Sequence, residues 1–174
     1  GTIVFNGGKI TAQGSTDRNG AGGGAAFGGG RGASNNDIKK MKIVVNGGIL
    51  NKSGLKSVAA IGGGQNGGGG TVQINGGTLN LTTYSGAVIG NGWDGNKNYT
   101  NITINGGTLN LNAATSGYAI GSDNATVKIT GGTISITCTS DAIEANESIA
   151  VADGTITIHS GKDGLHAEND EDNA

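Results

Sequence analysis

The sequence predicts an all-β fold of the parallel β-helix (β-solenoid) class, and three observations indicate it. Glycine accounts for 37 of the 174 residues, proline is absent, and one short phrase recurs six times along the chain. So many glycines exclude a helical bundle, because each costs about 1 kcal/mol in a helix interior. The lack of both proline and a three-residue glycine period excludes collagen.

The recurring phrase is apolar-x-apolar-Asn-Gly-Gly, and its last two copies are decayed. Its first apolar positions are Ile3, Ile43, Val72, Ile102, Val127 and Ile149. Counted at the second glycine, successive copies lie 40, 29, 30, 25 and 22 residues apart. A constant phrase with uneven spacing predicts about six coils whose walls stay in register while their loops differ in length.

Each coil is expected to hold three short strands. After the phrase comes a second alternating stretch, such as residues 108–111 (TLNL), and later a shorter unit, such as residues 119–121 (AIG). Alternation sends aliphatic side chains inward, and stacking places equivalent residues in columns about 4.8 Å apart. Gly-Gly after Asn supplies the unusual backbone angles of a corner.

A single coil cannot bury its apolar face, so residues 1–174 are expected to form one domain. The chain opens inside a strand pattern and stops in an acidic run, so we expect it to be a piece of a longer chain. Left-handed hexapeptide helices have a period of about 18 residues, shorter than every spacing here. Periods of 22 or more are typical of right-handed β-helices as a class, which makes a right-handed parallel β-helix the expected fold.

Several functions are excluded or disfavoured. No apolar run reaches the ~20 residues of a membrane helix, so no membrane insertion is expected. The glycine-rich stretches lack a phosphate-binding motif, and the ten basic residues among residues 1–140 are too dispersed for a nucleic-acid footprint. Cys138, the single cysteine, continues the inward alternation and is expected in the core.

Two features indicate carbohydrate contact. The second strand exposes a column of threonines and, two residues on, a column of asparagines, whose hydroxyls and amides could bind a polysaccharide or only solvate the sheet face. One loop holds two aromatic rings that could stack on a sugar or cover the hydrophobic edge of the coil. The candidate carbohydrate-binding residues are Thr78, Asn80, Thr108, Asn110, Trp93 and Tyr99. Ice binding would require regular Thr-x-Thr ranks, which are scarce.

Acidic residues gather at the end of the chain. Residues 1–140 carry ten basic and four acidic groups, whereas residues 141–174 carry one and nine. The coil spacing places Asp141 above Asp163, and two carboxylates so close repel by roughly 3–4 kcal/mol at an effective dielectric near 20. Solvation, protonation or a divalent cation could relieve this, and calcium favours such oxygen donors. The candidate metal ligands are Asp141, Asp163, Glu168, Asn146, Asp123 and Asn169.

Residues 160–170 (SGKDGLHAEND) resemble the recurrent signature of a family of secreted bacterial carbohydrate-binding β-helix domains, formerly a domain of unknown function. Residues 141–146 (DAIEAN) resemble a variant of it, and the strong resemblance covers residues 126–174. The resemblance implies a pectate-lyase-like architecture, calcium, an acidic plant polysaccharide, and an extracellular or bacterial cell-surface location. Carried over by position, it implies Asp141, Asp163 and Glu168 as calcium ligands, with Asn146 and Asn169 as neighbours.

The sequence therefore predicts a calcium-stabilised, non-catalytic carbohydrate-binding module that binds a plant or acidic polysaccharide. The alternative is a structural solenoid, a stalk, adhesin or filament-forming segment, because open β-edges favour end-to-end self-association. A calcium-dependent lyase would need a basic residue near the acidic columns. Only Lys162 lies there, and no arginine follows Arg31, so no enzyme is expected.

Overall fold

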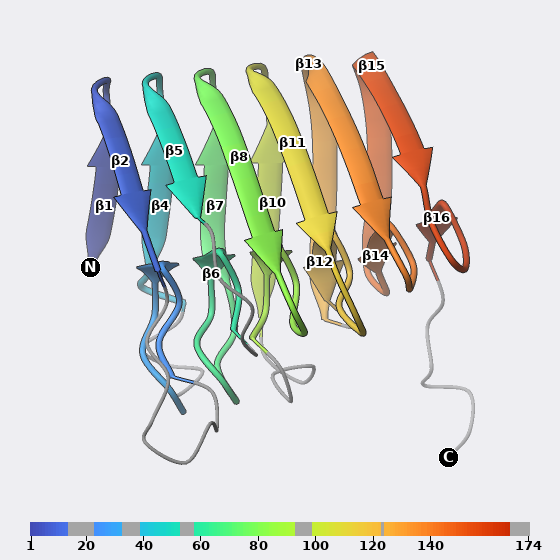
Figure 1. Cartoon of the computed structure of the whole chain (residues 1–174), viewed down its shortest axis with the longest axis horizontal. Helices are drawn as coiled ribbons and strands as arrows, with labels where there is room; N and C mark the ends of the chain where they lie inside the picture. The colour runs from blue at the N-terminus through green and yellow to red at the C-terminus, as the bar shows by residue number, and fades with distance from the viewer. Residues whose placement is uncertain (14–22, 33–38, 53–57, 93–98, 123, 168–174) are drawn as a thin grey trace.

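The computed structural model describes residues 1–13, 23–32, 39–52, 58–92, 99–122 and 124–167, and within these ranges every regular element is a β-strand. The strands stack in a row from the N-terminus to the C-terminus (Figure 1). All the neighbouring strands pair in parallel. The prediction of an all-β, solenoid-like chain of parallel strands is confirmed.

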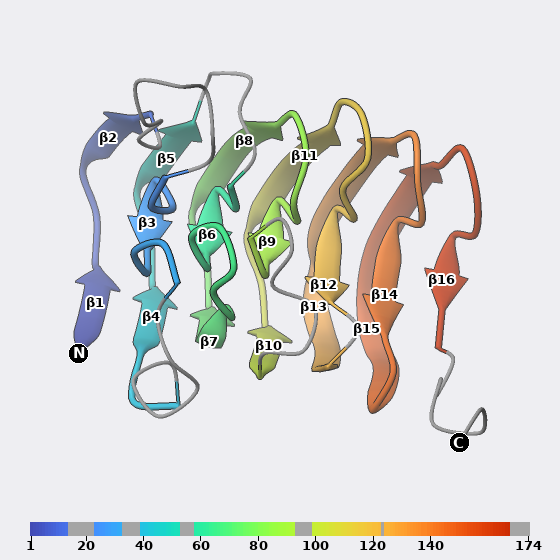
Figure 2. The ribbon, with the colours of Figure 1, turned by 90° about the horizontal axis from the view of Figure 1, so that it is seen from below.

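The strands form three walls, which we call the first, second and third wall in chain order within each coil. The first wall contains β1 (Thr2–Phe5), β4 (Lys42–Val45), β7 (Gly70–Ile74), β10 (Thr100–Ile104) and the first halves of β13 (Ala125–Cys138) and β15 (Ser148–His159). The second wall contains β2 (Lys9–Ala12), β5 (Ile49–Lys52), β8 (Thr78–Thr83), β11 (Thr108–Ala113) and the second halves of β13 and β15. The third wall contains β3 (Phe27–Gly28), β6 (Ile61–Gly62), β9 (Ile89–Gly90), β12 (Ile120–Ser122), β14 (Ile143–Ala145) and β16 (Leu165–His166). Figure 2 shows the third wall as a second row of short arrows.

The core is a set of aliphatic columns that run from coil to coil. In the first wall Ile43 pairs with Val72, Val72 with Ile102, and Ile102 with Val127, and all four are fully buried. Ile3 and Ile149 continue this column in the terminal coils and are half-buried. The predicted inward column is therefore confirmed, and Cys138 also lies in the core, 6% exposed.

Glycine has a geometric role at the corner between the first two walls. The second glycine of the repeated phrase has a positive φ in all six coils, as at Gly107, where φ is 99°. A Cβ on Gly107 would lie 2.9 Å from the carbonyl oxygen of Gly77 in the coil before. The corner thus needs a residue without a side chain, as the sequence predicts.

The third wall has a glycine column of its own, formed by Gly28, Gly62, Gly90 and Gly121. Each has a positive φ, and a Cβ on Gly90 would lie 2.1 Å from the carbonyl oxygen of Gly121. This column ends after the fourth coil. In the fifth and sixth coils its positions are taken by Glu144 and His166, which introduce side chains where the earlier coils have none.

A ladder of exposed side chains, the corner ladder, follows the corner asparagines. Each amide Nδ2 donates to the Oδ1 of the asparagine one coil earlier, and a threonine hydroxyl ends the series. The ladder consists of Asn6, Asn46, Asn75, Asn105 and Thr130, with donor–acceptor distances of 2.8, 2.7, 2.7 and 2.8 Å. Such ladders reinforce the register of stacked strands.

Candidate functional site

The outer face of the second wall carries the predicted polar columns. Thr78 pairs with Thr108, and Asn80 pairs with Asn110, so the sequence places each pair correctly in adjacent coils. Asn51 extends the asparagine column into the second coil. These strands lie side by side across the front of Figure 1.

The asparagines of this face are linked by side-chain hydrogen bonds into a second ladder, the groove ladder. Asn80 Nδ2 donates to Asn51 Oδ1 at 2.9 Å, and Asn110 Nδ2 donates to Asn80 Oδ1 at 2.8 Å. Each primary amide has two N–H donors and two carbonyl lone pairs, and a ladder bond uses only one of each. The ladder therefore fixes the orientation of the amides and leaves each of them one N–H donor and one lone pair that the ladder does not use.

A shallow, open groove of about 400 Å³ lies over this face. Its lining residues come from four consecutive strands, β5, β8, β11 and β13, and are Asn51, Lys52, Asn80, Leu81, Thr82, Asn110, Leu111, Asn112, Ser135 and Thr137. Asn80 and Asn110 are thus part of the groove. Thr78 and Thr108 lie in the neighbouring column and are not among its lining residues.

Lys52 lies at one end of the groove and was not predicted as a functional residue. It pairs with Leu81, so it stands in a column that is otherwise aliphatic, and it is only 3% exposed. Its Nζ donates to the carbonyl oxygen of Thr82 at 2.6 Å. Burial lowers the pKa of Lys52 from 10.5 to about 8, because desolvation disfavours the ammonium form. The sequence does mark Lys52 as unusual, because the alternating pattern of the second strand predicts an aliphatic residue such as leucine at its position.

The two predicted aromatic contacts lie elsewhere. Trp93 falls outside the described residues. Tyr99 is half-buried just before β10, and its hydroxyl accepts a hydrogen bond from Asn101 Nδ2 at 3.1 Å. It is not among the residues that line the groove.

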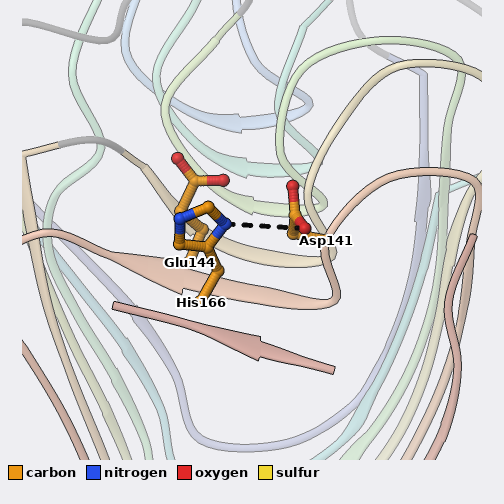
Figure 3. A group of neighbouring side chains, drawn as sticks. All are labelled: Asp141, Glu144 and His166. Atoms are coloured by element: carbon orange, nitrogen blue, oxygen red, sulfur yellow. Dashed lines mark ion pairs between the residues drawn. The ribbon is translucent and has the colours of Figure 1, made fainter. Parts of the chain in front are cut away.

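A second group of functional side chains, the C-terminal cluster, consists of Asp141, Glu144 and His166. One potential ligand atom from each lies within 4.8 Å of the others. Figure 3 shows the imidazole of His166 beside the carboxylate of Glu144 and joined to Asp141 by an ion pair. Asp141 and Glu144 are buried, and His166 is half-buried. The cluster forms where side chains replace the glycine column of the third wall.

Asp141 contacts several neighbouring polar groups. Its Oδ1 accepts a hydrogen bond from the Asp163 amide at 3.0 Å, and its Oδ2 lies 3.8 Å from Lys162 Nζ. His166 Nδ1 lies 3.6 Å from Asp141 Oδ1. Burial alone would raise the pKa of Asp141, but this hydrogen bond, Lys162 and His166 outweigh it and lower the pKa below its usual value. Asp141 is therefore ionised at neutral pH.

The other predicted metal ligands divide into two groups. Asp163 lies next to Asp141 as expected, but its side chain is 71% exposed and its Oδ2 lies 3.7 Å from His166 Nδ1. Asn146 is half-buried directly after β14. Asp123, Glu168 and Asn169 fall outside the described residues. Sequence reasoning missed Glu144 and His166, although the change from glycine to Glu and then His within one column was visible.

Comparison with known proteins gives one finding. Residues 100–174 match the family model described as carbohydrate-binding domain-containing protein. The match covers less than half of the chain and includes part of the groove, from Asn110 to Thr137, together with the whole C-terminal cluster. It supports a carbohydrate-binding role. The chain has no match among curated proteins or solved structures.

The described residues contain no helix of the length and apolarity that would cross a membrane.

Proposed function

We propose that this chain is a non-catalytic carbohydrate-binding module, built on a right-handed parallel β-helix of the pectate-lyase-like kind, in a secreted or cell-surface bacterial protein. The observation that carries the proposal is the match of residues 100–174 to a carbohydrate-binding family. The polar face of the second wall supports it, because part of that face lies within the match. Its amides and hydroxyls suit a ligand rich in hydroxyl groups.

We further propose that calcium stabilises the acidic end of the solenoid. Asp141, Glu144 and Asp163 supply carboxylate oxygens from two adjacent coils, and Asp141 and Glu144 are buried close together. Calcium takes six to eight oxygens, including backbone carbonyls and water, so these carboxylates fit part of its shell. Glu168, Asn146, Asn169 and Asp123 remain the proposed further ligands. Bound calcium would supply positive charge to the carboxylates of an acidic polysaccharide.

The protein's own residues prepare this end for a cation. The Asp163 amide orients the carboxylate of Asp141, and the lowered pKa keeps that carboxylate charged. His166 lies against both Asp141 and Asp163. An imidazole nitrogen suits zinc better than calcium, so the two metals should be compared directly.

Lyase activity at the acidic end of the solenoid is less favoured than non-catalytic binding. Lys162 is the basic residue expected near the acidic columns, and its Nζ lies 3.8 Å from Asp141 Oδ2, in an ion pair within the protein. Incubation with pectate tests this directly. We expect no rise in absorbance at the unsaturated-uronate band, and a rise would overturn the non-catalytic assignment.

The binding test is affinity electrophoresis of the whole chain through gels that contain one polysaccharide each. The panel includes polygalacturonate and several neutral plant glycans, each run with calcium and with EDTA. Retardation by at least one glycan supports the proposal. If none retards the chain, the structural alternative is favoured, and sedimentation over a range of protein concentrations would then test for end-to-end self-association.

A further inference from the structure

We propose that the groove of the second wall binds one extended, neutral glycan chain that runs along the solenoid axis, with successive sugars over successive coils. This inference rests on the proposed carbohydrate-binding function and assigns it a site, a ligand class and a direction. The site is separate from the acidic C-terminal cluster, since the two share no residue.

The direction follows from the lining residues. Four consecutive coils contribute to the groove, but each strand contributes only two or three residues, all within a stretch of three. With coils about 4.8 Å apart the groove extends about 14 Å along the axis, whereas three residues span about 7 Å along a strand. A linear ligand makes most contacts if it crosses the strands. The coil spacing is also close to the length of one pyranose unit in an extended chain, so each sugar meets an equivalent set of side chains.

The ligand class follows from the charge of the lining. Nine of the ten lining residues are uncharged, and seven of these carry an amide or a hydroxyl. Lys52 is the one ionisable group among them, and its buried ammonium donates to the Thr82 carbonyl. The outward surface therefore offers neutral donors and acceptors, which match sugar hydroxyls. It presents no exposed cation to a uronate carboxylate within this lining.

The groove ladder supplies preorganisation. Asn51, Asn80 and Asn110 hold one another in a single orientation, so little side-chain entropy remains to be lost on binding. The lining contains no aromatic ring. Affinity should then come from repeated hydrogen bonds and should rise with the length of the glycan.

The chain offers a matched control for the test, because it has two exposed asparagine ladders. The double variant Asn80→Ala/Asn110→Ala removes the amides of the groove ladder in the third and fourth coils. The double variant Asn75→Ala/Asn105→Ala makes the same chemical change in the same coils, but at the corner. All four side chains are exposed, so both variants should fold, and their melting temperatures verify this.

Binding is measured by affinity electrophoresis against neutral plant glycans and against polygalacturonate, with calcium or with EDTA. We expect the groove variant to lose tenfold or more in affinity for a neutral glycan, the corner variant to stay within twofold, and EDTA to have no effect on this binding. Oligosaccharides of the same glycan should gain affinity up to about four sugars, the span of four coils, and little beyond.

Three results would overturn the inference. The groove variant could bind neutral glycans as the unmodified chain does, or a disaccharide could bind as tightly as a hexasaccharide. The chain could also bind only polygalacturonate in an EDTA-sensitive manner, in which case the proposed function stands and the groove assignment fails. Absence of binding to every glycan would instead remove the proposed function itself.

Discussion

Replacing Gly90 with alanine should be among the most damaging small changes in this protein. Gly90 lies in the third wall with a φ of 146°, where an alanine is strained. Its new Cβ would lie 2.1 Å from the Gly121 carbonyl oxygen and 3.1 Å from the Cβ of Ala87. The oxygen belongs to the backbone of the next coil, so relief requires the two coils to move apart.

The magnitude follows from two contributions. A non-glycine residue in this backbone region costs about 1–3 kcal/mol, and overpacking of a close-packed site costs about 1–3 kcal/mol more. The free energy of unfolding should therefore fall by about 2–6 kcal/mol. At about 2–4 °C for each kcal/mol in a chain of this size, the melting temperature should drop by about 4–24 °C.

Thermal unfolding followed by circular dichroism measures this effect, with Gly30→Ala as the matched control. Gly30 does not have a positive φ, and nothing lies within 4 Å of a Cβ built on it. The control should melt within about 2 °C of the unmodified chain. If Gly90→Ala melts there too, the close stacking of the third wall is not a constraint on this fold.

Three further outcomes are expected. Because the folded-state pKa of Lys52 is about 8 and the unfolded value is 10.5, the unfolded chain binds more protons in between. Urea midpoints should therefore rise with pH across that window, and Lys52→Met should abolish the rise and stabilise the chain at pH 7 by about 1–3 kcal/mol. Asp141→Asn should destabilise the chain at pH 7 by about 1–3 kcal/mol, and this difference should disappear as pH falls through the lowered pKa of Asp141. Asp153→Asn, a change of an exposed residue, serves as the control. An equal loss of stability in both variants would contradict the reasoning. Calcium should raise the melting temperature, and EDTA should reverse this rise. Glu144→Gln or Asp163→Ala should reduce the rise that calcium causes. A larger rise with zinc than with calcium would indicate a zinc site that includes His166.

The walls of this protein could be predicted from its sequence because their rules are local. Alternation fixes which side chain points inward, and Asn-Gly-Gly marks each corner, so the columns of Ile102 and of Asn80 are correctly placed in adjacent coils. The third wall is harder to predict in detail, because each of its strands is only two or three residues long. The sequence aligns Glu144 and His166 with the glycine column, but alternation over so few residues does not predict that their side chains meet that of Asp141.

The groove was only partly predictable for a different reason. The sequence identifies the asparagine column, but the groove depends on how far the side chains of the neighbouring columns extend from the sheet. The path of a long side chain is equally hard to foresee. Lys52 occupies a leucine position and still reaches the Thr82 carbonyl in the next coil, which requires knowledge of the packing around its four methylene groups.

The direction of the asparagine ladders has a consequence for the whole molecule. In every hydrogen bond of the two ladders, the amide nitrogen of the later coil donates to the amide oxygen of the coil before it. The side-chain dipoles therefore add along the axis instead of cancelling, as peptide dipoles add in an α-helix. The stack of coils is thus electrically polar, with its negative pole toward the C-terminal coils, where the acidic residues also gather and a cation would be attracted.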